Sequence, residues 1–109
     1  MKLAVPYDTV SGQVFRQFEQ TPVLKLYTVE DGEVFSSELV GTMAEGVQDI
    51  IGLLQMLEAD GLLCGDMEES TRQLLHDEGI VFYSGFYEDA DEAVSDFLNG
   101  FVLFGPDDG

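Results

Sequence analysis

Basic residues are scarce in this sequence. Its 109 residues include 4 Lys and Arg against 22 Asp and Glu, which gives a formal net charge of -18 at pH 7. Nucleic-acid binding depends on Lys and Arg that neutralise phosphates, so this composition argues against a nucleic-acid partner. Anionic membrane surfaces are disfavoured for the same reason. The excess of carboxylates indicates a solvated acidic surface or, where they cluster, attraction of a cationic partner or metal.

Cysteine and histidine occur once each, as Cys64 and His76. A single cysteine excludes an internal disulfide and is typical of a reducing cytosol. One histidine does not allow a convincing Ser-His-Asp or Cys-His arrangement, and no second histidine completes a metal pair. We therefore predict no catalytic residue, no dedicated metal site and no enzymatic activity.

Long apolar runs are missing as well. The longest ones are much shorter than the about 20 residues that a membrane-spanning helix needs. Met1 and Lys2 lead only into Leu3–Val5 before Pro6, which does not resemble a signal peptide. A hydrophobic fraction of 45% with 8 Phe is nevertheless enough for the core of one folded domain. We predict a cytoplasmic, single-domain protein.

The fold prediction depends on a pattern between Val47 and Ser84. Two short apolar runs, Gly61–Gly65 and Ile80–Tyr83, are separated by a helical pattern, which is typical of a parallel β-α-β unit. The segment before them, Val47–Ala59, has a wide apolar stripe and is predicted to be helical. Asp66 stands three residues before a glutamate, so it is predicted to cap the helix between the two strands.

The N-terminal half is predicted to form an antiparallel meander. Lys2–Val5 is expected to be a short strand that ends at Pro6, because proline cannot donate a hydrogen bond to a ladder. Gln13–Phe18 is a further candidate for a short strand. Val23–Val29 alternates in polarity, and Val34–Val40 follows it after Asp-Gly, the favoured pair for a tight hairpin turn.

A third helix is predicted to begin at Asp89 and Glu92, which repeat the capping pattern, and to end at Gly100. Residues 1–100 then form one domain, and residues 101–109 form an apolar and then acidic tail whose GPDDG end is expected to be disordered. Right-handed crossovers place the helices on both faces of a five-stranded mixed sheet. The predicted fold is a three-layer α/β/α sandwich of ribonuclease H-like topology.

Three segments of the chain resemble one known family. They read KLAVPYD, QFEQTPVLKLYTVEDGEV and GLLCGDMEESTRQLLHDEGIVFYSG. Their order and spacing are similar to those of the dinitrogenase iron–molybdenum cofactor biosynthesis family, and the resemblance covers Lys2 to about Asn99. It implies a small cofactor carrier or chaperone that binds the iron–molybdenum cofactor or an iron–sulfur precursor. It also implies cofactor-assembly proteins as partners.

The sequence departs from the family pattern at three loops. One is the connection Gly41–Gly46, where the family is often rich in histidine and glycine and this chain has no histidine. Where the family typically carries His-Phe-Gly followed shortly by Pro, this chain has Gln17, Phe18 and Glu19, with Pro22 retained. Where the family often carries a Gly-Gly-Ile-Gly-like turn, the chain reads Cys-Gly-Asp-Met from Cys64.

Ligands of open α/β sheets bind beyond the carboxyl ends of the strands, where strand order reverses. The loops expected at that edge supply our candidate cofactor-binding residues: Asp8, Gln17, Phe18, Glu19, Cys64, Gly65 and Asp66. Cys64 could give a thiolate to an iron–sulfur cluster, although a buried small side chain in a strand is the commoner role. For Asp66 a helix cap is the commoner role.

Two other functions stay open at this point. A degenerate family member could act as a protein–protein interaction module without cofactor, and the apolar stripe of Val47–Ala59 with Phe101–Phe104 could then bury a homodimer surface. A ribonuclease H-like fold can also hold a two-metal nuclease site, for which Asp8, Asp66 and Glu45 are the candidates. The missing basic surface argues against the nuclease.

Overall fold

The computed structural model describes the backbone of residues 1–104 and the side chains of residues 1–100. In chain order, its elements are β1 (Lys2–Tyr7), the 3₁₀ turn η1 (Phe18–Gln20), β2 (Val23–Glu30), β3 (Glu33–Gly41), α1 (Val47–Met56), β4 (Gly61–Leu63), α2 (Glu69–Asp77), β5 (Phe82–Tyr83) and α3 (Ala90–Phe104).

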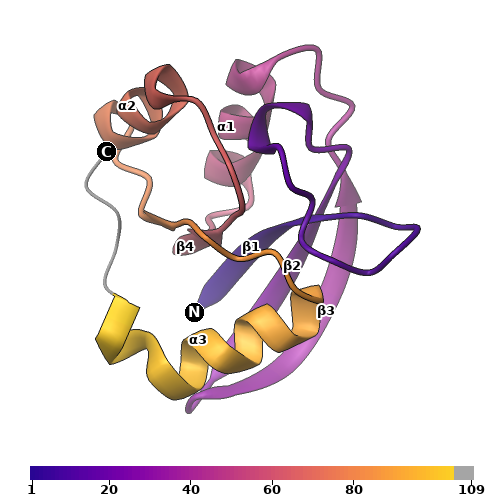
Figure 1. The fold of residues 1–109 in the computed structure, drawn as a ribbon, viewed down its shortest axis with the longest axis vertical. Helices are drawn as coiled ribbons and strands as arrows, with labels where there is room; N and C mark the ends of the chain where they lie inside the picture. Colours follow the sequence, from indigo (N-terminus) through magenta and orange to yellow (C-terminus); the bar gives the residue numbers. More distant parts are fainter. Residues whose placement is uncertain (105–109) are drawn as a thin grey trace.

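The five strands form one mixed sheet in the order β3-β2-β1-β4-β5 (Figure 1). β1 pairs antiparallel with β2 and parallel with β4. β4 and β5 run parallel, with Leu62 opposite Phe82 and Leu63 opposite Tyr83. The predicted parallel pair is therefore confirmed, as is the mixed sheet with antiparallel strands on one side of β1. The ribonuclease H-like label stays a prediction.

Helices cover both faces of the sheet, with α1 and α2 on one side and α3 on the other (Figure 1). β2 shows how the alternation in the sequence divides the core. Leu24 and Leu26 are buried in the cluster that includes Ile50 of α1, whereas Tyr27 and Val29 are buried in the cluster that includes the α3 side chains. The period of two predicted for this strand is confirmed.

The β2–β3 hairpin turns through Asp31 and Gly32, as predicted. Their φ angles are 53° and 78°, which is the pair of left-handed conformations that a type I′ turn requires. Glycine adopts such a φ without steric cost, and Asp tolerates it better than most residues.

Two strand predictions near the N-terminus are wrong. β1 does not end before Pro6 but runs to Tyr7. The Pro6 carbonyl accepts a hydrogen bond from Phe15 N–H at 2.9 Å. The nitrogen of Pro6 lies on the same side of the strand, away from β2, so the lack of an N–H there removes no hydrogen bond between β1 and β2. The segment Gln13–Phe18 forms isolated bridges to three different parts of the chain and then enters η1, so it is not a strand.

α3 begins as predicted, because the Asp89 carboxylate accepts hydrogen bonds from the N–H groups of Asp91 and Glu92 at 2.9 and 3.2 Å. Gly100 leaves the helical conformation, with φ -133° and ψ 16°, but helical backbone continues beyond this kink to Phe104. An apolar tail was expected to begin at residue 101, directly after the helix. The GPDDG segment expected to be disordered lies outside the described residues.

Asp91 on α3 also ties this helix to β2. Its carboxylate accepts hydrogen bonds from Lys25 Nζ at 2.8 Å and from the Tyr27 hydroxyl at 2.6 Å. Lys25 holds the pKa of Asp91 below its usual value, with the Tyr27 bond as a second cause. Burial raises the pKa of Tyr27 well above its usual value, and the bond to Asp91 adds to the effect. Lys25 is therefore already paired within the domain.

Candidate functional site

The segment before η1 lies against the loop that follows β4. Asp66 N–H donates to the Arg16 carbonyl at 2.7 Å, and Phe18 N–H donates to the Asp66 carbonyl at 3.0 Å. Gly65 lies beneath this contact, and a Cβ added there would come within 2.9 Å of the Arg16 carbonyl oxygen. The absence of a side chain at Gly65 is what lets the two segments approach. This assembly forms the edge of the sheet at which the ligand site was predicted.

The Asp66 side chain joins two neighbouring loops. It accepts hydrogen bonds from the Tyr87 hydroxyl at 2.5 Å and from Arg16 Nε at 2.9 Å. The Tyr87 bond, and then Arg16, hold the pKa of the Asp66 carboxyl below its usual value. The guanidinium of Arg16 also lies 5.3 Å from the centre of the Tyr87 ring. The prediction that Asp66 caps α2 is wrong, because its carboxylate binds Tyr87 and Arg16 and the residue at the start of α2 is Glu68.

Glu19 performs the capping role that was predicted for Asp66. Its carboxylate accepts a hydrogen bond from the N–H of Glu68, the residue that precedes α2, at 2.8 Å. Partial burial alone would raise the pKa of Glu19, but hydrogen bonds from the Thr71 side chain and from Glu68 N–H outweigh it and lower the pKa. A carboxylate near the first turn also complements the helix dipole.

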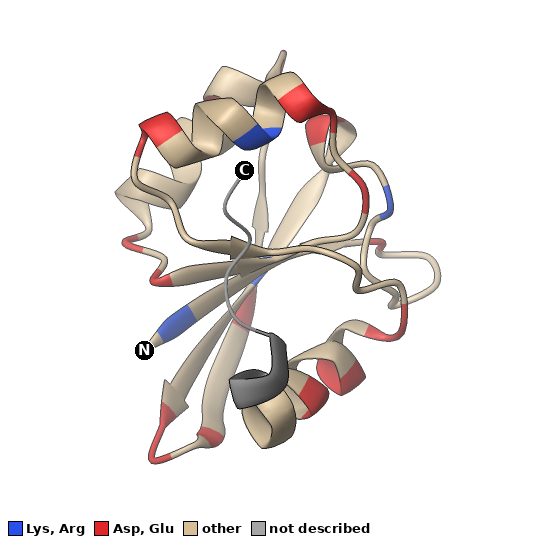
Figure 2. Ribbon diagram, turned by 60° about the vertical axis from the view of Figure 1, so that its left-hand side comes forward, with Lys and Arg blue, Asp and Glu red and all other residues tan. Residues whose placement is uncertain are grey.

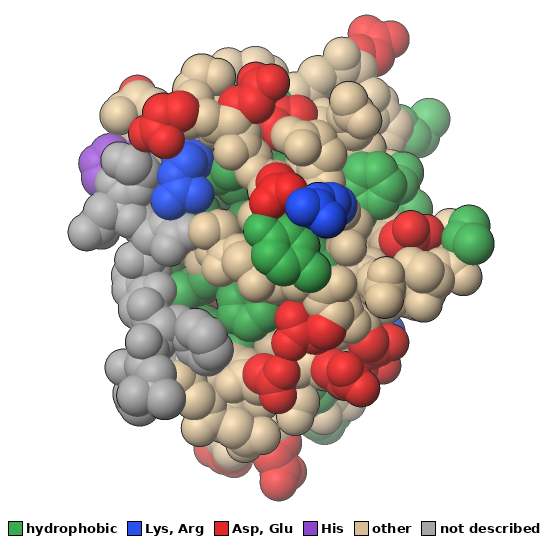
Figure 3. All heavy atoms as spheres, viewed as in Figure 1, with side chains coloured by type: hydrophobic (Ala, Val, Ile, Leu, Met, Phe, Trp, Pro, Cys, Tyr) green, Lys and Arg blue, Asp and Glu red, His purple; other side chains and the backbone are tan. Residues whose placement is uncertain are grey.

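An open depression of ≈ 550 Å³ lies at this edge. It is lined by Gln17, Glu19, Gln20, Asp66, Met67 and Glu68. Its ionisable groups are carboxylates, and the pKa values of two of them, Glu19 and Asp66, are lowered, so these two are anionic near neutral pH. Figure 3 shows a face of the molecule on which basic side chains are few among acidic ones. The depression is therefore suited to cations and to neutral polar groups.

The structure brings together only some of the predicted residues. Gln17, Glu19 and Asp66 line the depression. Phe18 is fully buried in the core between the sheet and α1. Asp8 is held in its own loop, where its carboxylate accepts the Val10 N–H at 2.9 Å, and it does not line the depression.

Cys64 is fully buried as well, with its Sγ 3.6 Å from the Tyr83 carbonyl oxygen. Of the two roles weighed for this residue, the structure shows the buried side chain in the sheet. Cys64 does not line the depression, so a ligand bound there does not contact the thiol.

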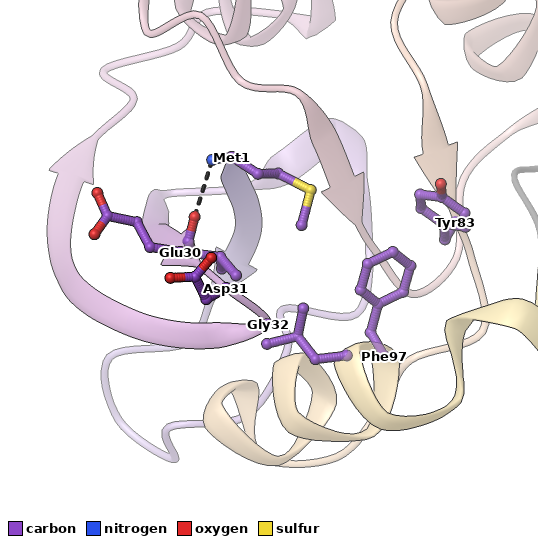
Figure 4. Close-up of a pocket in the computed structure, with 8 residues that line it drawn as sticks. Met1, Glu30, Asp31, Gly32, Tyr83 and Phe97 are labelled. Atoms are coloured by element: carbon purple, nitrogen blue, oxygen red, sulfur yellow. Dashed lines mark hydrogen bonds between the residues drawn. The ribbon is translucent and has the colours of Figure 1, made fainter.

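A second hollow, which nothing in the sequence signalled, lies at the opposite end of the sheet. It measures ≈ 650 Å³ and is lined by Met1, Val29, Glu30, Asp31, Gly32, Tyr83, Phe97 and Leu98 (Figure 4). The Tyr83 and Phe97 rings meet edge to face at 4.7 Å between centres. The amino group of Met1 donates to the Val29 carbonyl at 2.9 Å. The candidate site residues take no part in this hollow.

The comparisons with known proteins identify the family. The model of the dinitrogenase iron-molybdenum cofactor family matches residues 1–100. The chain belongs to this family. No curated protein matches the chain by sequence.

Two solved structures show the same fold as this family member. One is a candidate dinitrogenase from Methanocaldococcus jannaschii, with a TM-score of 0.75 and 19% identity over 98% of this chain and 94% of that chain. The other is a candidate NifB protein from Thermotoga, with a TM-score of 0.67 and 19% identity over 91% and 88%. Identities this low show likeness of fold and leave the function of this family member open.

The side chains at the depression do not fit the cofactor that the family name implies. Iron–sulfur clusters are held by thiolates, and the one thiol of this dinitrogenase cofactor family member is buried. His76 lies seven residues into α2, about 10 Å along the helix from its first residue at a rise of about 1.5 Å per residue. Within the part of the chain that the structure describes, no three His, Cys, Asp or Glu side chains are placed to hold a metal ion.

The described part of the chain also contains no helix with the length and apolar character needed to cross a membrane.

Proposed function

We propose that this chain is a small, non-enzymatic member of the dinitrogenase iron-molybdenum cofactor family that acts by contacting cofactor-assembly proteins and does not itself hold a metallocluster. The observation that carries the proposal is the donor set at the strand-end depression. It offers carboxylates and amides, while the Cys64 thiol is fully buried and does not line the depression. Sulfur ligands are what an iron–sulfur cluster requires. A cytoplasmic location goes with this proposal.

The departures from the family pattern point the same way. Gln17 stands where the family typically carries histidine, and Gln17 lines the depression. Its side-chain amide donates to the Glu19 carboxylate, which in turn binds the start of α2. The residues that would face a ligand are thus engaged in holding the two segments together. This arrangement favours a structural use of the rim.

A cofactor carrier, as implied by the family resemblance, is the second candidate. The observation in its favour is position, because the depression lies beyond the carboxyl ends of the parallel strands, where α/β sheets bind their ligands. A cluster bound there would be held by oxygen donors and the Met67 thioether. The nuclease alternative has no such support, since Asp8 does not join Asp66 at the depression.

Anaerobic reconstitution separates the two candidates. The purified protein is incubated with ferrous iron, sulfide and reductant, desalted, and examined by iron analysis and visible absorption. We expect a colourless protein without stoichiometric iron. Stoichiometric iron with charge-transfer absorption would overturn the proposal. The variant Cys64→Ser, treated in parallel, shows whether any iron taken up is held by the thiol.

Calorimetric titration with purified cofactor-assembly proteins of the source organism tests the positive half of the proposal. We expect a saturable interaction in the absence of any cofactor. If the protein is folded by circular dichroism and binds none of these assembly proteins, the proposal is overturned as well.

A further inference from the structure

β3 forms one edge of the sheet and is its longest strand. It has nine residues, whereas β5, at the other edge, has two. In the described part of the chain β3 pairs with β2 alone (Figure 1). Every residue of the strand except Val40 is exposed. Alternate N–H and C=O groups of such a strand face away from the sheet, ready to pair with another extended chain.

The protection that long edges usually have is limited here. Natural edge strands are commonly blocked by lysine, proline or a bulge. β3 contains neither lysine nor proline. A bulge is present near the turn, where Val34 pairs with Val29 and Ser36 with Thr28, leaving Phe35 without a partner on β2. From Ser36 to Gly41 the register is regular, and this segment could continue the sheet.

The exposed side chains on β3 combine apolar and acidic character. Phe35 is 73% exposed and Leu39 is 55% exposed. Glu33 and Glu38 lie on the same strand, and Figure 2 shows acidic residues at the tip of the hairpin. The cation paired across from Leu39 is Lys25, whose side chain is 16% exposed and bound to Asp91. The edge therefore has a negative potential that this lysine does not neutralise.

Charge decides which chain this edge can accept. A second copy would bring the same acidic strand and a net charge of -18 of its own, and like charges across a pairing are destabilising. A strand with lysine or arginine is attracted instead, both by Glu38 and by the field of the whole domain. Leu39 offers an apolar contact on the opposite face of the new strand.

We propose that the β3 edge binds an extended, lysine- or arginine-containing segment of a partner protein, which pairs with Ser36–Gly41 and adds one strand to the sheet. The inference rests on the proposed function as a protein-binding domain and names the surface and the partner chemistry. Main-chain hydrogen bonds supply the affinity, and cross-strand contacts with Glu38 and Leu39 supply the preference.

Binding of a short peptide of alternating lysine and valine, followed by fluorescence anisotropy, tests the proposal. We expect saturable binding that weakens as salt is added, and amide protection gained at Ser36–Gly41 in hydrogen-exchange NMR. Glu38→Lys should raise Kd about fivefold, because a favourable cross-strand pair becomes a repulsive one. Glu78→Lys, the same charge change at the far end of α2, should leave Kd within a factor of about two, since its effect is screened over distance.

A peptide with the same side chains and N-methylated amides on its pairing edge is the decisive control. Equal binding of this peptide would mean charge attraction without strand pairing and would overturn the proposal, as would protection located away from β3. A dimer of the protein alone, seen by light scattering and protected at β3, would overturn it as well. If the protein binds cofactor-assembly proteins but not the peptide, strand addition at β3 is refuted and the proposed function stands. Stoichiometric iron uptake would instead refute the proposed function itself.

Discussion

The Tyr87 hydroxyl donates a hydrogen bond of 2.5 Å to the Asp66 carboxylate, and this contact joins the loop after β5 to the loop after β4. Arg16 reaches the other oxygen of the same carboxylate from a third segment. Three stretches of chain therefore meet at one side chain. The geometry explains why Asp66, although placed at the predicted ligand edge, is occupied by protein groups.

Replacing Asp66 should change the ionisation of Tyr87. The hydrogen bond to Asp66 raises the pKa of Tyr87 above its ordinary value of 10.0, because the carboxylate disfavours the phenolate. In Asp66→Asn the negative charge is gone, so the pKa of Tyr87 should fall toward 10.0. A ¹³C NMR titration of the Tyr87 ring measures it. Asp8→Asn should leave Tyr87 unchanged, and an unchanged Tyr87 in Asp66→Asn would contradict the contact.

Glu19→Gln should remove a pH-dependent part of the stability. The folded pKa of Glu19 lies below its ordinary value of 4.5, so its contribution is complete above that pH and is lost as the pH falls through the folded pKa. We expect the variant to lose about 1 kcal/mol in free energy of unfolding at pH 7, the scale of a lost helix cap.

Urea unfolding at several pH values measures this effect. The difference in free energy of unfolding between the wild-type protein and Glu19→Gln should disappear as the pH falls below the pKa of Glu19 in the folded protein. Glu78→Gln, at the other end of α2, is the matched control and should show no loss at pH 7, because a carboxylate at the C-terminal end of a helix opposes the dipole. A deficit in Glu19→Gln that is constant with pH would point to lost packing and contradict the electrostatic account.

The sequence predicted the elements whose cause is local. The Asp-Gly turn needs two positive φ angles, and β2 needs a period of two; both signals lie within a few residues. The parallel pair followed from two short apolar runs with a helix between them. These predictions succeeded because each signal lies within one continuous stretch of the sequence.

The site could not be predicted in the same way, because its contacts join distant residues. Asp66 and the glutamate three residues later match a capping pattern, yet the carboxylate that caps α2 belongs to Glu19, which is 49 residues from Glu68. Asp66 instead binds Arg16, at a separation of 50 residues. Spacing along the chain does not record which of two acidic residues lies nearer a helix end.

Gly65→Ala should destabilise the domain, while Gly52→Ala should not. A Cβ at Gly65 would meet the Arg16 carbonyl at 2.9 Å and the Phe86 carbonyl at 3.3 Å, so the backbone must shift. We expect a loss of about 1–3 kcal/mol, typical of overpacking. Gly52 is exposed within α1 with nothing within 4 Å of an added Cβ, so alanine should gain about 1 kcal/mol of helix propensity there. Urea unfolding of both variants checks the pair, and a neutral Gly65→Ala would show that the two segments do not pack this closely.

The reactivity of Cys64 tests the burial on which the proposed function depends. Its side chain is fully buried between the sheet and the α1–α2 layer, so a thiol reagent should modify it only when the domain opens. We expect labelling of the native protein by a disulfide reagent to be slower than that of the urea-unfolded protein by a factor close to the unfolding equilibrium constant. Gly65→Ala, which weakens the domain next to the thiol, should label faster than the wild type, and Gly52→Ala should label no faster. Rapid, complete labelling of the native wild-type protein would mean that the thiol reaches the rim, and the cofactor carrier would then become the better account of this family member.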